Sequence, residues 1–560
     1  MLNFIIGRNN SGKTEKIRAL IAERASENKK CILIVPEQFS FESERSILEK
    51  IGAQKMLNVD ILSFTRLAFV INEQYGKALN KTIDDGTRKV LMSLSLEALS
   101  GKLEYFKRFS SKPALLSNLL TFVTELKQCA VTPDEIAEIS GKTGNKSLGK
   151  KLSELSLIAA SYDALVSRSF FDDENLLTIA ADMISETDFF DGKAVYFDAF
   201  CGFTKQERNC IKSILPKAEN VFISLCTDRD LSREGVSVFE NVNSEFSYLK
   251  KCAAEQNVGV SYPEILNVKE DGRSPELVYL EKYLCGEEFK PYKEECDNIV
   301  VCAAGNRADE ADFVACEIKK LLRCNPTLRC RNIAVIERTA GTYDKELSES
   351  FKKYGVPMFE DKRRPIGIQP VMVFVKCLLA LCAEGFSTES FMRLLKTGLT
   401  ALSGDEISEL ENYAFLWNID GSKWRRDFTE NPDGLGFDVT EKSQEKLIRL
   451  NDIRKRSVLP VLAFKKDFEE ADGEKKSRLI YEFLIKNGVT ERLREKIEYL
   501  VSSGDTVLCE EQDTVWATLM DMLGKMASAI GETVITAKRY SELFNILLSA
   551  VTLGSLPQEL

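Results

Sequence analysis

The sequence contains no histidine in 560 residues. That absence excludes serine and cysteine triads with a histidine base, zinc sites of the HExxH type, and a histidine general acid or pH switch. Any catalysis by this chain would have to use lysine, arginine, aspartate or glutamate side chains, or a metal ion held by carboxylates.

Paired cysteines are also missing, because the 15 cysteines occur singly and no CxxC pair is present. The closest two are Cys377 and Cys382. Such spacing excludes the usual zinc and iron-sulfur ligand sets. Scattered cysteines are typical of a protein whose thiols stay reduced, which favours a cytoplasmic protein.

The sequence has neither a long hydrophobic run nor an excess of positive charge. The apolar run at 2–6 is too short for a secretory signal, and the longest run, 371–383, contains Lys376 and is too short to cross a bilayer. We therefore expect no membrane segment. Lysine and arginine total 76 against 86 aspartates and glutamates, a net charge of −10, so contact with DNA would require a local basic surface.

Apolar runs alternate with amphipathic stretches, which predicts an α/β fold with a parallel sheet covered by helices on both faces. Strands are expected at 2–6, 31–35, 57–63, 194–200 and 220–228. They belong to a first α/β domain at 1–85 and 191–290, interrupted by a leucine-rich helical insertion at 86–190.

A second α/β domain is predicted at 291–390. Its strands are expected at 298–304 and 332–338, with a helix at 308–322 between them. Residues 391–560 have a helical, charge-laced pattern and are predicted to form a second helical insertion. Only the first part of the second domain is therefore expected within this chain.

A phosphate-binding motif lies between the first expected strand and the helix after it. It matches GxxxxGK[ST] at every fixed position and consists of Gly7, Arg8, Asn9, Asn10, Ser11, Gly12, Lys13 and Thr14. Glycines let the loop curl so that backbone N–H groups point at a phosphate, the lysine reaches the β- and γ-phosphates, and the threonine hydroxyl binds Mg²⁺. The alternative is a chance glycine turn, but the strand-loop-helix context favours ATP binding.

Hydrolysis would need an aspartate at the end of another strand to join Thr14 at the Mg²⁺ ion. Asp198 follows the apolar run VYF and is the candidate, although it could instead merely cap a strand. The next residue is Ala199, whereas motor ATPases usually place there a glutamate that orients the attacking water. The sequence thus predicts a site that holds nucleotide and turns it over poorly.

Several further segments resemble the B subunit of AddAB-type helicase-nucleases. Besides the phosphate loop, they are VPEQFSFESER at 35–45, LSFTRLAF at 62–69, FDAFCGFTKQE at 197–207, NIAVIER at 332–338 and GVPMFEDKRRPI at 355–366. The resemblance covers the chain in order. It departs at Ala199, where the family usually has glycine, and at Lys205, where it usually has proline.

This resemblance implies a superfamily 1 helicase-like architecture with two RecA-like domains, large helical insertions and a decayed motor. In such complexes the A subunit is the translocating motor. The B subunit contacts single- and double-stranded DNA, recognises the recombination hotspot Chi, and carries a C-terminal nuclease domain with an iron-sulfur cluster. Family members are about twice this length, so the resemblance implies an N-terminal portion, with the nuclease and its cluster expected only in the missing part.

Side chains after the second, third and fourth expected strands are candidates for contact with DNA, because open α/β sheets bind ligands at the carboxyl ends of their strands. In the family the corresponding loops take part in Chi recognition. The candidates are Gln38, Ser40, Phe64, Arg66, Phe69, Phe200 and Phe203. Aromatic rings would stack on bases and Arg66 would contact a phosphate or base edge. The alternative is that Phe64 and Phe69 are ordinary core residues.

Two basic clusters are weaker candidates. Arg338 ends an expected strand, and a cluster follows at Lys362, Arg363 and Arg364; either could serve DNA or an interdomain contact. Trp424 stands among Lys423, Arg425 and Arg426, which form either a nucleic-acid patch or, as the pattern favours, a solvated helix face.

Three functions remain open from the sequence. The leading one is an ATP-binding, DNA-binding scaffold subunit of a helicase-exonuclease complex for double-strand break repair, in a heterodimer with an A subunit and with weak or no helicase activity of its own. The rivals are an autonomous P-loop ATPase or helicase, and a non-catalytic interaction protein with a vestigial phosphate loop.

Overall fold

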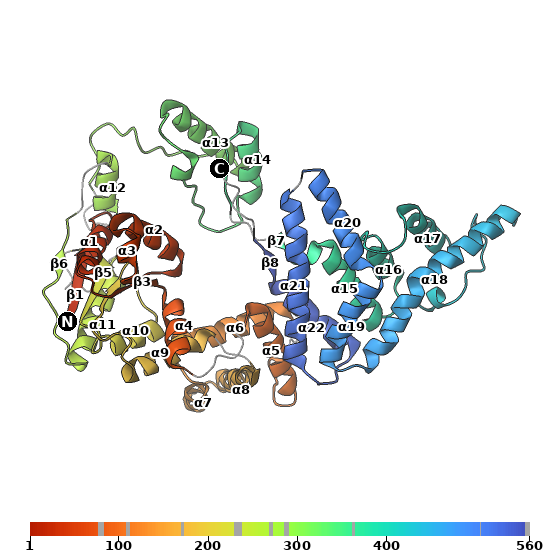
Figure 1. The fold of residues 1–560 in the computed structure, drawn as a ribbon, viewed down its shortest axis with the longest axis horizontal. Helices are drawn as coiled ribbons and strands as arrows, with labels where there is room; N and C mark the ends of the chain where they lie inside the picture. The colour runs from red at the N-terminus through yellow and green to blue at the C-terminus, as the bar shows by residue number, and fades with distance from the viewer. Residues whose placement is uncertain are drawn as a thin grey trace.

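A computed structural model describes residues 1–76, 83–107, 112–169, 173–228, 238–267, 273–284, 290–360, 364–504 and 506–554. Figure 1 shows an α/β domain at one end, a large helical region at the other, and α5 and α6 between them. Among these residues, no helix is both long enough and apolar enough to cross a membrane.

The α/β domain is built on a six-stranded, fully parallel sheet in the order β3-β2-β4-β5-β1-β6. Its strands are β1 (Leu2–Gly7), β2 (Cys31–Ile34), β3 (Val59–Leu62), β4 (Ala194–Phe197), β5 (Asn220–Cys226) and β6 (Glu264–Ile265). The predicted α/β class and the first five strands are confirmed. β6 was not predicted, because it consists of only two residues and both are exposed.

Alternate strand residues face opposite sides of the sheet and form two separate cores. Ile5 and Leu33 lie in one core, beneath α1 (Lys13–Ser26), α2 (Ser40–Ile51) and α3 (Ala53–Met56). Phe4 and Ile32 lie in the other core. The helices on that side are α4 (Phe64–Tyr75), α9 (Asp173–Glu186), α10 (Lys205–Ile214) and α11 (Glu240–Glu255). α9 therefore packs on the sheet, although it falls within the predicted insertion.

The rest of the insertion shares one hydrophobic core with helices from the far end of the chain. The insertion contributes α5 (Asp85–Ala98), α6 (Pro113–Gln128) and α8 (Lys146–Ser169) to this core, and α7 (Pro133–Lys142) packs on α8. Two ion pairs join α5 to that end: Asp84 contacts Lys525 at 2.6 Å and Glu97 contacts Arg539 at 2.9 Å. The two predicted helical segments thus form one body.

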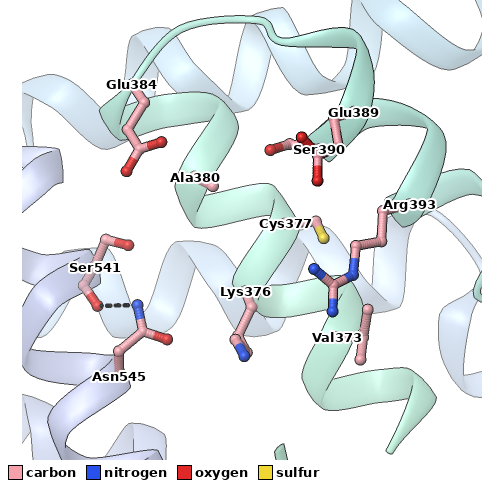
Figure 2. Close-up of a pocket in the computed structure, with 10 residues that line it drawn as sticks. All are labelled: Val373, Lys376, Cys377, Ala380, Glu384, Glu389, Ser390, Arg393, Ser541 and Asn545. Atoms are coloured by element: carbon pink, nitrogen blue, oxygen red, sulfur yellow. Dashed lines mark hydrogen bonds between the residues drawn. The ribbon is translucent and has the colours of Figure 1, made fainter. Parts of the chain in front are cut away.

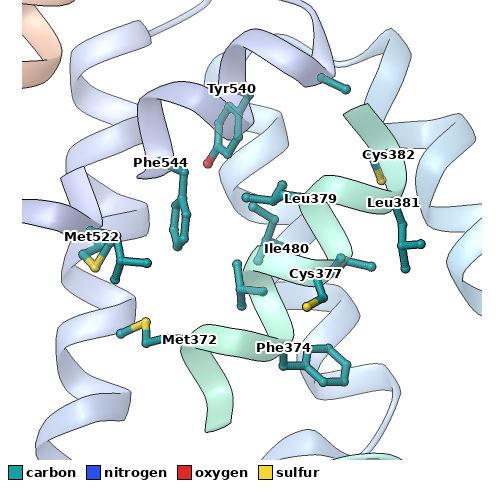
Figure 3. Close-up of a cluster of buried hydrophobic side chains, with 14 of the residues drawn as sticks. Met372, Phe374, Cys377, Leu379, Leu381, Cys382, Ile480, Met522, Tyr540 and Phe544 are labelled. Carbon is teal, nitrogen blue, oxygen red and sulfur yellow. The ribbon is translucent and has the colours of Figure 1, made fainter. Parts of the chain in front are cut away.

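The C-terminal helical region surrounds the apolar helix α15 (Pro370–Ala383). Figure 3 shows part of this core, where Met372 and Leu379 of α15 lie among residues of neighbouring helices, including Met522 and Phe544. The neighbours are α16 (Thr388–Leu395), α17 (Gly404–Leu416), α18 (Glu441–Glu470), α19 (Gly473–Lys486), α20 (Val489–Ser502), α21 (Thr506–Ile530) and α22 (Ala537–Ala550). The lysine within this apolar run did not prevent its burial as a helix.

The segment between these bodies contains α12 (Pro275–Leu284), α13 (Arg307–Cys324) and α14 (Asp344–Tyr354). The predicted helix at 308–322 is confirmed by α13. The strands expected at 298–304 and 332–338 are absent from the described residues, and Val301 and Ile336 in them are almost fully exposed. A strand without hydrogen-bonded neighbours is marginally stable. Among the described residues beyond the six-stranded sheet, a short antiparallel pair forms between β7 (Arg364–Pro365) and β8 (Thr552–Leu553).

Candidate nucleotide site and the strand ends beside it

The phosphate loop connects β1 to α1 at the carboxyl edge of the sheet. Gly12 has a φ of 87°, a left-handed conformation that favours glycine. Gly7 has no room for a side chain, because a Cβ there would lie 2.3 Å from the Ser11 Oγ and 2.9 Å from the Leu266 carbonyl oxygen. Both glycines of the motif are therefore required by the backbone.

Lys13 holds the loop in this shape. Its Nζ donates hydrogen bonds to the carbonyl oxygens of Gly7 at 2.8 Å and Arg8 at 2.7 Å. No side chain caps the start of α1 among the described residues, and the first hydrogen bond of the helix runs from the Lys16 N–H to the Gly12 carbonyl. The N–H groups of the first turn thus face a place where an anion would be stabilised.

Arg8 ties the loop to neighbouring elements. Its guanidinium donates to the Asp228 carboxylate at 2.9 Å, beyond the end of β5, and to the carbonyl oxygens of Glu281 and Lys282 at 3.4 and 3.3 Å. Those carbonyls belong to the last turn of α12. The sequence motif gives no sign of these contacts, because any residue can occupy the second position of GxxxxGK[ST].

Asp198 directly follows β4 and is almost completely buried. Its Oδ1 accepts a hydrogen bond from the Ser224 Oγ at 2.5 Å, and its N–H donates to the Ile34 carbonyl oxygen at 3.1 Å. Only β5 separates β4 from the strand that carries the phosphate loop. Ser224 is a functional candidate that the sequence analysis missed; a lone polar residue inside the apolar run of β5 was its signal.

Ala199, the residue after Asp198, has a φ of 65°. This left-handed backbone conformation raises the energy of a residue with a Cβ. Glycine at this position would adopt the same conformation without strain.

The candidates for DNA contact separate into exposed and buried side chains. Gln38, Arg66 and Phe69 are exposed, and Ser40 is half-buried. Gln38 lies in a 3-10 turn after β2, whereas Arg66 lies in the first turn of α4, where its N–H donates to the Ser63 Oγ at 3.2 Å. The Arg66 guanidinium contacts the Glu44 carboxylate at 3.5 Å, so the start of α4 lies beside α2.

The phenylalanines expected to line the same surface pack together instead. Phe64 lies with its ring centroid 5.5 Å from Phe200 and 6.2 Å from Phe203, and Phe200 lies 5.0 Å from Phe203. Phe64 and Phe203 are buried in the core beneath α4 and α10, and Phe200 is half-buried against it. A base cannot stack on a covered ring, so Phe64 has the core role that was its alternative, and Phe203 is covered in the same way. Phe69, for which a core role was the same alternative, is exposed.

The weaker basic candidates are dispersed. Arg338 and Arg364 are exposed, whereas Lys362 and Arg363 lie outside the described residues. Trp424 is completely buried, and its Nε1 donates to the Thr388 Oγ1 at 2.9 Å. The indole therefore lies on neither a nucleic-acid patch nor a solvated face, whereas the neighbouring Lys423, Arg425 and Arg426 are exposed.

Comparison with known sequences was consistent with this arrangement. Residues 4–281, which span the α/β domain and the helices inserted into it, match the family described as "ADDB, N-terminal". This part of the chain is therefore similar to the N-terminal part of ADDB proteins.

Similarity to curated proteins extends over the whole chain. The chain is 29% identical to proteins named as the B subunit of an ATP-dependent helicase/deoxyribonuclease from Acetivibrio thermocellus and Thermoanaerobacter sp. strain X514, and 28% identical to one from Clostridium acetobutylicum. All of this chain is aligned in each case, against 50%, 49% and 49% of the relative. The chain thus spans about half the length of these relatives.

Two of the cavities that the described residues form lie beyond residue 300, away from the phosphate loop. One, of about 1080 Å³, is bordered by α13 and α14. The other, of about 160 Å³, lies among α15, α16 and α22, and Figure 2 shows Lys376, Cys377 and Arg393 at its wall. Burial raises the pKa of the Cys377 thiol, so this cysteine is not an activated nucleophile. Within the described ranges, no group of three or more aspartates, glutamates or cysteines could hold a metal ion.

Proposed function

We propose that this chain provides the ATP-binding and DNA-contacting part of the B subunit of a helicase-deoxyribonuclease, a heterodimeric enzyme of double-strand break repair by homologous recombination. The observation that best supports this proposal is the shape of the phosphate loop. Gly12 has a left-handed backbone, the Lys13 side chain closes the loop, and within the described structure no side chain caps α1. The names of the relatives support ATP dependence, DNA as substrate and a second kind of subunit.

The residues present fit a nucleotide with Mg²⁺. Backbone N–H groups at the start of α1 would receive a phosphate, and Lys13 would exchange its contacts with loop carbonyls for phosphate oxygens. The Thr14 hydroxyl and the Asp198 carboxylate would hold the Mg²⁺ ion, which would draw its other ligands from the phosphates and water.

Nucleotide turnover is proposed to be slow. Asp198 is followed by Ala199 and not by a carboxylate that could orient an attacking water. This argues against an autonomous motor. The phosphate loop is intact, which argues against a vestigial nucleotide site. A substitution at Gly7 or Gly12 would have distorted the loop, and both glycines are present. ATP is thus proposed to be bound by a scaffold whose partner subunit supplies translocation.

The nucleotide part is tested by calorimetry with ATP and Mg²⁺. Wild-type protein should bind, and Lys13→Ala should lose most of that binding, because the ammonium that closes the loop is also the group that would reach the phosphates. Lys29→Ala is the matched control, since Lys29 is exposed and pairs with Glu27 of the same turn. Equal affinity of wild type and Lys13→Ala would reject ATP binding at this loop.

The DNA part is proposed to use the exposed residues beside the strand ends, namely Gln38, Ser40, Arg66 and Phe69, with Phe200 at the margin. These residues would contact single-stranded DNA and read Chi. Arg66 is the strongest candidate for DNA contact, because its side chain is exposed and it follows β3 at the carboxyl edge of the sheet, where α/β folds bind ligands. An arginine-base contact contributes about 1–3 kcal/mol, or roughly 5- to 150-fold in affinity.

Chi recognition is tested in the enzyme assembled from the full-length B subunit and its partner. Arg66→Ala and Gln38→Ala should abolish the response to Chi while DNA unwinding continues at nearly the wild-type rate. Arg45→Ala is the control, because Arg45 lies on neighbouring α2 and is also exposed, but pairs with Glu49 of its own helix. If both variants respond to Chi normally, the recognition site is elsewhere; if unwinding collapses, these residues maintain the fold.

A further inference from the structure

Arg8 of the phosphate loop caps the C-terminal end of α12. The last carbonyl groups of an α-helix have no partner inside the helix, and this end carries a partial negative charge. The Arg8 Nη1 donates to the Glu281 and Lys282 carbonyl oxygens there, at 3.4 and 3.3 Å, and lies 3.9 Å from the Glu281 carboxylate. The helix is thus attached to the loop that would receive a phosphate.

The contacts of Arg8 with α12 are weaker than the contact that holds Arg8 itself. The Arg8 Nη2 donates to the Asp228 carboxylate at 2.9 Å, and the guanidinium carbon lies 5.4 Å from the centroid of the Phe239 ring. N–H···O hydrogen bonds are strongest at about 2.9 Å, so the contacts with α12, at 3.3 and 3.4 Å, are the weaker ones. Asp228 and Phe239 would therefore keep the guanidinium in place while Nη1 changes its partner.

The helix itself is only lightly packed. Among the side chains of α12 that the structure describes, Glu276 alone is buried, and Leu277 and Leu280 are 42% and 39% exposed. α12 has 10 residues, and a helix of that length is marginally stable in water without tertiary contacts. Loss of the contact with Arg8 would therefore release α12 and let it fray.

The charges that face Arg8 are negative. They are the Asp228 and Glu281 carboxylates and the C-terminal end of α12. Lys282 is the only positive side chain of α12, and its ammonium lies over an aromatic ring of the same helix. The triphosphate of ATP is a polyanion, and at Lys13, whose Nζ donates to the Arg8 carbonyl at 2.7 Å, it would be repelled by these groups.

We infer that α12 and the phosphates of ATP compete for Arg8. The docked helix occupies the guanidinium of an empty loop, and a bound phosphate draws Nη1 away and releases the helix. A charge-assisted hydrogen bond to a phosphate oxygen is stronger than one to a neutral carbonyl. Release also moves Glu281 and the helix end away from the phosphates. This inference rests on the proposed function, because it concerns the regulation of nucleotide binding at that loop.

Release of α12 would reach the part of the chain that leads to the helices α13 and α14. The Glu276 carboxylate accepts a hydrogen bond from the Asp297 N–H at 3.2 Å, and the Tyr279 hydroxyl donates to the Pro291 carbonyl at 3.2 Å. These contacts attach residues 290–298 to α12, and the chain continues from there to α13 (Figure 1). A change at the phosphate loop would thus be passed along the chain beyond the α/β domain.

The first test is hydrogen exchange in the full-length protein, with and without ATP and Mg²⁺. ATP should speed exchange of residues 276–283 about fivefold or more, because binding of one competitor weakens the other by the same factor. Exchange of residues 8–16 should slow, because phosphates would cover their N–H groups. In Lys13→Ala, ATP should change neither segment. In Arg8→Gln, residues 276–283 should exchange fast before ATP is added.

The second test is calorimetric binding of ATP by Leu280→Gly. Glycine weakens an exposed helix without changing its charge, so α12 should compete less well, and ATP should bind about three- to fivefold more tightly. Leu48→Gly is the matched control, since Leu48 is 44% exposed within α2, which does not contact Arg8. It should bind ATP like wild type.

The outcomes separate this inference from the proposed nucleotide site. If ATP slows exchange of 8–16 but leaves 276–283 unchanged or slower, the inference is wrong and the nucleotide site stands. If ATP changes neither segment, ATP binding at the loop fails and the inference fails with it. Unchanged or weaker ATP binding by Leu280→Gly, with Leu48→Gly like wild type, would also overturn the inference.

Discussion

Replacing Ala199 by glycine should stabilise the α/β domain, because Ala199 has a left-handed backbone at a φ of 65°. Such a conformation costs a residue with a Cβ about 1–2 kcal/mol. Glycine loses more conformational entropy on folding than alanine does, and this loss offsets roughly 0.4–1 kcal/mol of the stabilisation from relieved strain. The expected net effect is a stabilisation of about 1 kcal/mol.

Hydrogen exchange at β4 is the suitable assay, because all three tryptophans, at 417, 424 and 516, lie in the helical region and their fluorescence would not report on the sheet. A stabilisation of about 1 kcal/mol slows exchange through local or domain opening about fivefold. The amides of Val195 to Asp198 lie in β4 or immediately after it, so they should show the change.

Ala130→Gly provides a matched control in the same chain. Ala130 has a φ of 49° after α6, far from the phosphate loop, and should gain a similar amount locally. Ala22→Gly, inside α1, should instead lose about 1 kcal/mol. If Ala130→Gly stabilises and Ala199→Gly does not, the backbone after Asp198 is not in the strained conformation described above.

Three further outcomes are expected. Asp84→Asn should keep the N-terminal cap of α5 but lose the ion pair with Lys525. The free energy of unfolding at neutral pH, measured by urea unfolding with tryptophan fluorescence, should fall by about 0.5 kcal/mol. Burial alone would raise the pKa of Asp84, but hydrogen bonds from Lys525 and Thr87 outweigh burial and lower the pKa below 3.8. The wild-type protein should therefore be more stable than Asp84→Asn above pH 3.8, and this difference in stability should vanish as the pH falls through the lowered pKa. Trp424→Ala should cost about 3–5 kcal/mol by the same assay and leave DNA affinity unchanged, because the indole is core. Purified chain in Mg²⁺ should leave single-stranded DNA intact on gels; degradation that survives repurification would reveal a carboxylate site that the sequence pattern conceals.

The local features of the fold could be predicted from the sequence. Strands β1 to β5 are apolar runs flanked by helical periodicity, and the phosphate loop is encoded by two glycines whose backbone angles and close contacts require them. Each of these signals lies within a few residues of the element that it specifies.

Features that depend on distant segments could not be predicted. Phe64 and Phe203 look the same in the sequence whether they stack on a base or pack on each other. Only the contact between the start of α4 and the segment that precedes α10 decides between these roles. Trp424 among three basic residues resembles a surface patch, yet its ring fills a core built from helices that are distant in the sequence. The contact of Asp84 with Lys525 joins positions 441 residues apart, which no periodicity reveals.

The most direct test of the central claim is the rate of DNA-stimulated ATP hydrolysis by the purified protein without its partner. Motor enzymes typically turn over on the order of 1 to 1000 times per second. The arrangement of Lys13, Asp198 and Ala199 predicts calorimetric binding of ATP with turnover well below ~1 per second, with or without single-stranded DNA. Hydrolysis within the motor range that disappears in Lys13→Ala would contradict the account and identify the chain as a motor in its own right.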